Sequence, residues 1–379
     1  MDGTRLPGAF PEERVRAIRP ETALDPSHWL AAWRAREGGP EAVLGVCRRG
    51  TYRFIGSATE ALYLALATAR GSVRLLPDYL CPQLTRDLMA TGDEVHFYPV
   101  DERLRPDWSW IASFRPGVVK KVLVVHYYGV VQTIPDVLCE RDDLVFVEDA
   151  AHALWSEGVG QQGAMTAFSF RKFMPVSDGG ALLARDAAVH AGFGLAAPGW
   201  RPYVSALYLT LGWLEGRCAP WLRTRLLAQP ALTRAWEDSS GGRVRPRALS
   251  PLGRRLAAAA RPAEWARIRR EHYARYERLL PADDERLCRL YPSLPPGAVP
   301  YAFPVLLARR DDVRHLLLRA GVQARTSWDR IVQGGRAASA VAARILLLPL
   351  HQGLTTGDVE RVALALRTIV GERHGATHH

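Results

Sequence analysis

The stretch from Val145 to Arg185 constrains the fold of this chain more than any other, because it holds three short apolar runs separated by polar residues and glycines. The runs are Leu144 to Val147, Ala167 to Phe170 and Ala181 to Ala184. Such runs are typical of buried strands in a parallel sheet, whose carboxyl ends deliver side chains to a ligand crevice. The first run ends on Asp149 and the second on Lys172. We therefore predict an open α/β sheet, with Asp149 at a ligand and Lys172 in a loop between two strands.

An acid and a lysine at two such strand ends are the side chains that pyridoxal phosphate requires. This cofactor is an electron sink that a lysine holds as a Schiff base, while a carboxylate keeps its pyridine nitrogen protonated. A lysine amine is a poor nucleophile until a neighbouring cation or desolvation favours its neutral form, and Arg171 is such a neighbour. Lys172 would then move a proton as general base and general acid. We predict catalytic roles for Lys172 and Asp149.

The same residues resemble the DegT/DnrJ/EryC1/StrS family of fold-type-I sugar aminotransferases. The family pattern is an Asp-Ala-Ala-Gln/His block, a Ser-Phe pair, a lysine, six residues and Gly-Gly. In this chain the block is Asp149 to His152, the pair is Ser169-Phe170, and six residues separate Lys172 from Gly179-Gly180. Family members usually carry a few more residues between the serine and the lysine, so we expect a different loop shape here. Some members replace the lysine with histidine and are dehydratases; this chain keeps lysine, which favours transamination.

The resemblance implies further cofactor contacts. The segment from Arg53 to Leu62 reads as a turn entering a helix and resembles the family's Ser-Gly-Thr-x-Ala-Leu block, with Ala58 in place of the glycine. The backbone N–H groups of Ala58 and Thr59 would bind the cofactor phosphate at the helix N-terminus, together with the Ser169 hydroxyl. His152 occupies a position that in the family lies close to the cofactor ring and its phenolic oxygen, and we include it among the catalytic residues. A capped helix without a ligand is the alternative reading of the first block.

Two further expectations leave alternatives open. In the family, an aromatic residue a few places after the proline that ends the next strand stacks on the pyridine ring. Counting along this chain reaches Cys81, whereas Tyr79 is the nearest aromatic residue and has a core role as its alternative. His126 follows the apolar run Val122 to Val125 and resembles the family's His-x-Tyr-Gly strand end. We expect His126 to line the active site, with a structural role as the alternative.

The last third of the chain predicts a smaller α/β domain that resembles the small domain of the family. We expect a helix over 261–280, a strand over 301–307, a helix over 311–320, an edge strand over 321–325, a strand ending at His351 and a helix from Asp358. The predicted fold is therefore α/β, with a mostly parallel sheet between helices in a large domain and a smaller carboxyl-terminal domain. We place the cofactor-binding domain at 1–240 and the small domain at 241–379.

The segment from 187 to 240 is atypical for the family, because arginines and tryptophans interleave with its apolar runs. Its apolar run over 203–214 is too short to span a membrane. The composition favours amphipathic helices that pack on a dimer partner, roof the active site or rest on a membrane surface. We expect a homodimer, with peripheral membrane contact as an alternative.

Composition narrows the remaining classes. A chain of 379 residues with a hydrophobic share of 48% is long enough for two domains and a large core. Its net charge of +11 suits an anionic substrate as well as nucleic acid, but no nucleic-acid-binding motif accompanies the charge, so we expect no nucleic-acid partner. Five scattered cysteines without CxxC spacing indicate reduced thiols in the cytoplasm and no metal site. The amino terminus lacks the apolar core of a signal peptide.

These observations predict an aminotransferase that uses pyridoxal phosphate and moves an amino group from glutamate to a keto-sugar, expected to be nucleotide-linked, in glycan or natural-product biosynthesis. The substrate rests on the family resemblance alone. Two alternatives are open. One is another pyridoxal-phosphate reaction on the same fold: a lyase, a decarboxylase or an amino-acid transaminase. The other is a non-enzymatic regulator or scaffold that keeps the fold.

Overall fold

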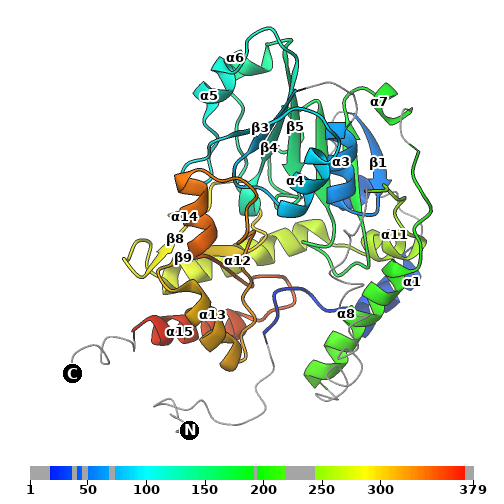
Figure 1. Cartoon of the computed structure of the whole chain (residues 1–379). Helices are drawn as coiled ribbons and strands as arrows, with labels where there is room; N and C mark the ends of the chain where they lie inside the picture. The colour runs from blue at the N-terminus through cyan, green and yellow to red at the C-terminus, as the bar shows by residue number, and fades with distance from the viewer. Residues whose placement is uncertain are drawn as a thin grey trace.

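The computed structural model describes residues 18–35, 41–44, 50–67, 73–191, 194–217 and 244–371. The described chain forms a large α/β part, at the top of Figure 1, and a smaller one below it. The large part contains β1 (Thr51–Ile55), β2 (Val73–Pro77), β3 (Val95–Tyr98), β4 (Lys120–Val125), β5 (Leu144–Ala150), β6 (Met165–Ser169) and β7 (Gly180–Ala184). These strands make one sheet in the order β1-β7-β6-β5-β4-β2-β3.

The large sheet is mostly parallel, as the sequence predicted. β3, β2, β4, β5 and β6 run parallel, whereas β7 pairs antiparallel with both β6 and β1. Every residue of β2, β4, β6 and β7 is buried, which explains why these sequences are largely apolar, because helices cover both faces of a parallel sheet. The carboxyl ends of β5 and β6 lie side by side, with Asp149 paired to Ala167.

Helices and one 3₁₀ turn surround this sheet. They are α1 (Pro26–Arg34), α2 (Glu41–Leu44), α3 (Ala58–Ala67), α4 (Pro82–Met89), α5 (Trp108–Ser113), η1 (Tyr127–Gly129), α6 (Asp136–Cys139), α7 (Ala188–Ala191), α8 (Arg201–Arg217) and α11 (Pro251–Ala258). Residues Thr51 to Ile55, part of which we expected as a turn before the phosphate helix, form strand β1 instead. This difference places the amino end of α3 directly after an edge strand.

The small part is built around a three-stranded antiparallel sheet in the order β10-β9-β8. Its elements are α12 (Pro262–Leu279), β8 (Leu287–Arg289), β9 (Phe303–Leu307), α13 (Arg310–Arg319), α14 (Arg336–Arg344), β10 (Ile345–Leu348) and α15 (Thr356–Gly371). α12 presents Trp265, Tyr273 and Tyr276 to the interior, as its periodicity predicted. The α/β fold class and the order of most elements are therefore confirmed.

The expected edge strand over 321–325 was wrong. This segment divides its backbone hydrogen bonds between two neighbours, so no continuous ladder forms: Val322 bridges Ile18, and Arg325 bridges Leu347 of β10. β10 and β8 are the two edge strands of the sheet, and the sequence did not predict β8. Arg325 thus takes part in an isolated β-bridge only, and its side chain is 44% exposed.

Only part of the atypical segment lies among the described residues. α8 forms over the predicted apolar run, buries Ala206 and Leu209, and exposes Tyr203 and Leu207. It packs beside α1, where the indole of Trp29 donates to the Thr210 hydroxyl at 3.0 Å (Figure 1). The second half of the segment, the proposed domain boundary, Cys47 and Cys218 lie outside the described residues. None of the described helices is both long and apolar enough to cross a membrane.

Candidate active site

A cavity of about 350 Å³ lies between the carboxyl ends of β5 and β6, the amino end of α3 and the small part. This volume is within the range of small-molecule sites. The cavity brings together five residues that the sequence singled out. These are Ala58, Thr59, Asp149, Ser169 and Lys172, which we call the cofactor wall. The structure thus gathers residues from three separate segments of the chain around one space.

Lys172 is one of only three lysines in the sequence. The other two are buried in structural contacts: Lys120 forms an ion pair with Asp143 at 3.0 Å, and the Lys121 ammonium donates to the Ala65 carbonyl at 2.9 Å. Burial lowers the pKa of Lys121 to about 8. Lys172 is therefore the one lysine of the chain that lines the cavity.

A tight turn places Lys172. The Phe173 N–H donates to the Phe170 carbonyl at 3.0 Å, and both phenylalanines are fully buried. Arg171 and Lys172 occupy the two central positions of this turn, so both side chains leave the core and line the cavity. The turn is short because only two residues separate Ser169 from Lys172, the departure from the family spacing seen in the sequence.

Arg269 of α12 supports the turn from below. Its guanidinium is fully buried and donates to the carbonyls of Phe173 at 3.2 Å and Tyr301 at 3.1 Å. Burial lowers the pKa of Arg269 to about 9. The Gln352 amide also donates to the Phe173 carbonyl, at 2.9 Å. Two residues that are distant in the sequence thus hold the backbone that carries Lys172.

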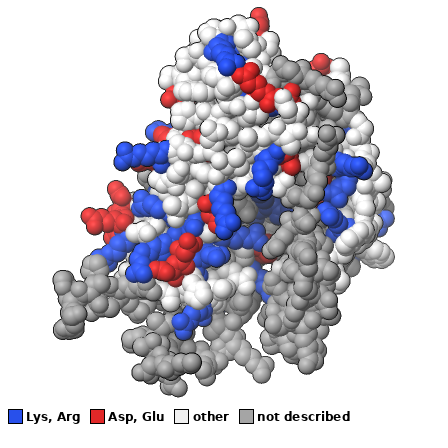
Figure 2. Space-filling model, in the orientation of Figure 1, with Lys and Arg blue, Asp and Glu red and all other residues white. Residues whose placement is uncertain are grey.

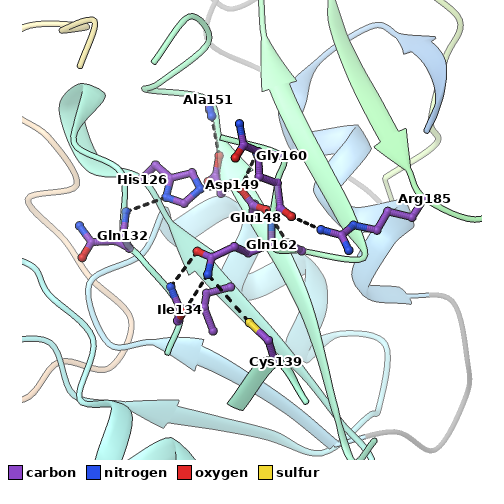
Figure 3. A network of polar contacts seen from close by, with 12 residues as sticks. His126, Gln132, Ile134, Cys139, Glu148, Asp149, Ala151, Gly160, Gln162 and Arg185 are labelled. Atoms are coloured by element: carbon purple, nitrogen blue, oxygen red, sulfur yellow. Dashed lines mark hydrogen bonds and ion pairs between the residues drawn. The ribbon is translucent and has the colours of Figure 1, made fainter. Parts of the chain in front are cut away.

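Asp149 and Glu148 are adjacent on β5 but serve opposite faces of the sheet (Figure 3). Asp149 lines the cavity, is 5% exposed and accepts a hydrogen bond from the Ala151 N–H at 2.8 Å. Burial raises the pKa of Asp149, while the charge of Lys172 acts in the opposite direction. A buried carboxylate on the cavity wall suits a cationic ring nitrogen, because such a partner offsets its desolvation.

Glu148 instead anchors a loop on the other face. Its carboxylate pairs with His126 at 2.9 Å and accepts from the N–H groups of Gly160 and Gly163. His126 Nδ1 accepts from the Gln132 N–H at 3.1 Å, as Figure 3 shows. His126 does not line the cavity. These contacts favour the structural alternative for His126 over the expected active-site role.

The amino end of α3 forms a cradle beside Ser169. A Cβ atom on Gly180 would lie 2.5 Å from the Phe168 carbonyl oxygen and 2.9 Å from the Ala58 nitrogen, so only glycine allows β7 to approach α3 this closely. The Ser57 hydroxyl accepts from the Glu60 N–H at 3.2 Å. The first N–H groups of a helix lack intrahelical partners and favour an anion such as phosphate.

His152 lies one layer behind the cavity wall, in a stack of aromatic rings. Its ring is parallel to those of Tyr301, Tyr128 and Trp328, with centroids 4.8, 5.1 and 5.4 Å away. Burial, followed by the charge of Lys172, lowers the pKa of His152 well below its usual value. Nδ1 of His152 is buried without a hydrogen-bond partner. His152 is therefore neutral and keeps one polar atom unsatisfied near the site.

The structure and the sequence favour different residues as the cover of the cofactor's pyridine ring. Tyr79 is fully buried, and its hydroxyl donates to the Ser327 carbonyl at 2.7 Å; burial raises its pKa to about 12. Tyr79 does not line the cavity, whereas Cys81 does, together with Trp328. The structure therefore favours the core role for Tyr79 and adds Trp328 as a candidate.

Sequence reasoning missed a second group of residues that line the cavity. Glu21, Tyr301 and Arg325 line it, along with Arg171; we call these four residues the arginine wall. Glu21, Tyr301 and Arg325 come from an amino-terminal segment, a loop before β9 and a loop after α13, and Arg171 comes from the turn after β6. His351 also lines the cavity, but its Nε2 bonds the Arg19 carbonyl and its Nδ1 accepts from the Gly353 N–H. No motif in the sequence joined these segments.

The arrangement fits pyridoxal phosphate on three observations. Lys172 is the single lysine at the cavity, Asp149 is a buried acid on the same wall, and the backbone at Gly180 leaves an anion cradle beside Ser169. Among the described residues, no group of three or more His, Cys, Asp or Glu side chains is placed to hold a metal ion.

Comparison with known proteins gives a consistent result. Residues 55–195 match the model of the DegT/DnrJ/EryC1/StrS aminotransferase family. A search of curated proteins by sequence found no match. Among solved structures, the aminotransferase TlmJ from Streptoalloteichus hindustanus is 23% identical, with a TM-score of 0.65 over 94% of this chain and 99% of that one.

Two further structures share the fold. Helicobacter pylori PseC, described as an aminotransferase involved in the biosynthesis of pseudoaminic acid, is 15% identical, with a TM-score of 0.66 over 95% of this chain and all of that one. DesI, solved in the presence of its TDP-sugar product, is 19% identical, with a TM-score of 0.66 over 96% of this chain and 95% of that one. The fold expected from the sequence is confirmed, and the match over residues 55–195 agrees with the family resemblance.

Proposed function

We propose that this chain is a pyridoxal-phosphate-dependent aminotransferase of the DegT/DnrJ/EryC1/StrS family, whose model its residues 55–195 match. In the proposed reaction it transfers an amino group from glutamate to the keto group of a nucleotide-linked sugar. The observation that carries the proposal is the position of Lys172, the only lysine at the cavity, on the same wall as the buried acid Asp149. We also propose a role in glycan or natural-product biosynthesis; it is supported by one structural relative described with pseudoaminic acid biosynthesis and another solved with its TDP-sugar product.

Each residue of the cofactor wall has a distinct task. When bound, pyridoxal phosphate supplies an electron sink for a carbanion next to the amino group. Lys172 Nζ would hold the cofactor and, when free, would move a proton as general base and general acid. The Asp149 carboxylate would pair with the ring nitrogen and keep it protonated. The N–H groups of Ala58 and Thr59 and the Ser169 hydroxyl would bind the phosphate.

His152 lies behind the cavity wall, where it would help to orient the cofactor ring and would not exchange protons with bulk solvent. Its parallel contacts with Tyr301 and Trp328 fix the plane of the imidazole. Because His152 is neutral, its ring can donate one hydrogen bond to an oxygen substituent of the cofactor without adding charge. We further propose a cytoplasmic homodimer in which the exposed Tyr203 and Leu207 of α8 contact the partner.

The low lysine content makes the first test unusually direct. Purified protein loaded with pyridoxal phosphate is reduced with borohydride, digested and analysed by mass spectrometry. The label should sit on Lys172, and Lys172→Ala should abolish both the label and the visible absorption band of the bound cofactor. Lys120→Arg is the matched control and should keep both. A label on neither residue, or a band that survives Lys172→Ala, would contradict the proposed cofactor site.

The donor and acceptor are tested by half-reactions. Glutamate added alone should convert the bound cofactor to its amine form, which shifts the absorption, and a nucleotide-linked keto-sugar should reverse the shift. Loss of carbon dioxide, or elimination without amine transfer, would favour a decarboxylase or a lyase. A protein that binds no cofactor at all would favour the non-enzymatic alternative.

A further inference from the structure

The segment after β2 does not carry a ring at the position where the sequence resemblance led us to expect one. Counting along the chain places Cys81 there, and Cys81 lines the cavity immediately before α4. Its thiol has no ring that could lie against a pyridine face. The nearest aromatic residue, Tyr79, is fully buried and does not line the cavity. Neither of these two residues therefore supplies a ring that stacks on the cofactor.

Three aromatic side chains line the cavity within the described part of the chain: Phe173, Tyr301 and Trp328. Phe173 is fully buried in the turn that carries Lys172. Tyr301 lies on the side of the lysine, since Lys172 Nζ is 5.6 Å from the centroid of its ring. Trp328 instead contacts Tyr79, with ring centroids 5.3 Å apart. Because Tyr79 is two residues from Cys81, Trp328 lies on the side of the cavity where the sequence predicted an aromatic cover.

The indole of Trp328 is held by rings of the large part. Its centroid lies 5.3 Å from that of Tyr79 and 6.0 Å from that of Tyr127, in tilted and edge-on arrangements. The His152 ring lies 5.4 Å away at an angle of 21°. Aromatic pairs attract each other at such distances and angles. The large part therefore fixes the indole, although the backbone of Trp328 belongs to the small part.

Hydrogen bonds tie the loop that carries this indole to the large part as well. The Tyr79 hydroxyl donates to the Ser327 carbonyl at 2.7 Å, and the Tyr128 hydroxyl donates to Ser327 Oγ at 2.8 Å. At the other end of the loop, the Gly335 N–H donates to the Asp78 carboxylate at 2.8 Å. The large part thus holds both ends of a loop that connects α13 to α14.

Trp328 has an unusual backbone conformation within this loop, residues 326–335, which we call the clasp. Its φ angle is 44°, in the left-handed region, which is rare and strained for a bulky side chain. Such strain persists only where the surrounding contacts fix it, and it is concentrated at ligand sites. The hydrogen bonds of the neighbouring Ser327 and the ring contacts of the indole supply that restraint. The strained conformation therefore places one chosen side chain at the cavity.

We propose that Trp328 covers the pyridine ring of the cofactor in place of a residue after β2, so that the bound cofactor joins the small part to the large part through the clasp. The inference rests on the proposed function for the identity of the cofactor. A pyridine ring that Asp149 keeps protonated is a cationic aromatic system, and the face of a tryptophan attracts it more strongly than other side chains do. A ligand that contacts both parts favours the arrangement in which the two parts meet.

The test measures binding of pyridoxamine phosphate, which has the cofactor's ring and phosphate but forms no covalent bond with Lys172. Trp328→Leu removes the indole, and Trp328→Phe keeps an aromatic ring. A double variant, Trp328→Leu with Cys81→Tyr, returns a ring to the position expected from the sequence. Trp33→Leu, at a residue of α1 that is 76% exposed, is the matched control. Calorimetry gives Kd, and hydrogen exchange gives the protection of the clasp amides.

We expect Trp328→Leu to raise Kd for pyridoxamine phosphate by about 3- to 30-fold, the range that one aromatic or cation–π contact provides. Trp328→Phe should lose less affinity, the double variant should recover part of the loss, and Trp33→Leu should bind as the parent does. Pyridoxamine phosphate should slow exchange of the clasp amides in the parent but not in Trp328→Leu. Equal affinity of Trp328→Leu and the parent would overturn the ring cover. Unprotected clasp amides in the parent would overturn the link between the two parts.

Further measurements keep the outcomes distinguishable. If Trp328→Leu does not fold, Trp328→Phe and the exchange of the parent decide. A larger loss of affinity in Tyr301→Leu than in Trp328→Leu would assign the cover to Tyr301 and overturn the proposal. If the parent binds pyridoxamine phosphate through Trp328 but aminates no acceptor, the proposed function fails while the ring cover stands. If the parent aminates an acceptor and Trp328→Leu keeps its affinity, the ring cover fails alone.

Discussion

The cofactor wall and the arginine wall line the same cavity, yet they are built in different ways. The cofactor wall comes from strand ends and one helix start, all within residues 55–195, and its backbone is fixed by the sheet. The arginine wall gathers Glu21, Tyr301 and Arg325 from loops far apart in the chain. Its fourth residue, Arg171, precedes Lys172 in the turn after β6. Strand ends hold the group common to a family, whereas loops hold what distinguishes one member.

Charge follows the same division. The cofactor wall holds one lysine and one buried acid, whereas the arginine wall holds two arginines and one carboxylate. On the molecular surface, Lys and Arg side chains gather in a band across the middle of the face in Figure 2, with Asp and Glu among them. The net charge of +11 thus has a counterpart inside the cavity, where it can act on a substrate.

The neighbouring acids of β5 give the sharpest comparison. Glu148→Ala should lower the free energy of unfolding by about 3–5 kcal/mol, because it leaves His126 and several N–H groups buried without their partner. The folded fraction should still bind cofactor. Denaturant unfolding and borohydride labelling measure the two effects. A stable Glu148→Ala protein that cannot be labelled would place Glu148 at the cofactor instead.

Asp149→Asn should have the reverse profile. We expect a loss of about 10²- to 10³-fold in kcat/KM, typical of removing one preorganised charge partner at a reacting group, with stability close to that of the parent because the volume is conserved. Steady-state kinetics and thermal unfolding check this. Activity within a few-fold of the parent would remove Asp149 from its proposed role.

A substitution of Arg269 tests whether this residue couples the cofactor wall to the arginine wall. Arg269→Met removes the Arg269 donor from the Tyr301 carbonyl and leaves the Phe173 carbonyl with the Gln352 amide alone, which should cost about 1–3 kcal/mol of stability. Because Phe173 closes the turn of Lys172 and Tyr301 belongs to the arginine wall, both cofactor affinity and KM for the donor should change. Arg267→Met on the exposed face of α12 is the control. A change confined to one wall would show that Arg269 does not couple them.

Low pH should reduce the contribution of Glu148 of β5 to the stability of the fold. The pKa of Glu148 is lowered: burial alone would raise it, but the bonds from His126, Gly160 and Gly163 outweigh burial. A carboxyl group with a lowered pKa contributes stability above its ordinary value of 4.5 and loses it as pH falls through the lowered value. Tm of the parent should therefore fall below about pH 4.5 more steeply than Tm of Glu148→Ala. Parallel pH profiles would contradict this account.

Tyr79→Phe should have the smallest effect. It removes the hydroxyl that donates to the Ser327 carbonyl, so we expect a stability loss of about 1 kcal/mol and no change in cofactor affinity. Trp328→Ala should instead weaken cofactor binding, because Trp328 lines the cavity. Fluorescence titration with pyridoxal phosphate distinguishes the two, and a large affinity loss in Tyr79→Phe would restore Tyr79 as the ring cover.

Local patterns in the sequence predicted the cofactor wall because its residues sit at regular positions. The apolar runs placed Asp149 and Ser169 at strand ends, and the helix signature placed Ala58 and Thr59. The position of His126 away from the cavity depends on its contact with Glu148, and the burial of Tyr79 depends on its contact with Ser327. Both contacts join residues far apart in the sequence. The arginine wall could not be predicted, since it forms only when the segment around Glu21 packs against the loops carrying Tyr301 and Arg325.

The scarcity of lysine has a consequence for selectivity in a crowded cell. An aldehyde cofactor condenses with any accessible primary amine, and most proteins offer many on their surface. Here two of the three side-chain amines are sealed in structural contacts, and arginine carries nearly all the remaining positive charge. The protein therefore keeps a strongly cationic character while offering the aldehyde a single side-chain amine with which to react.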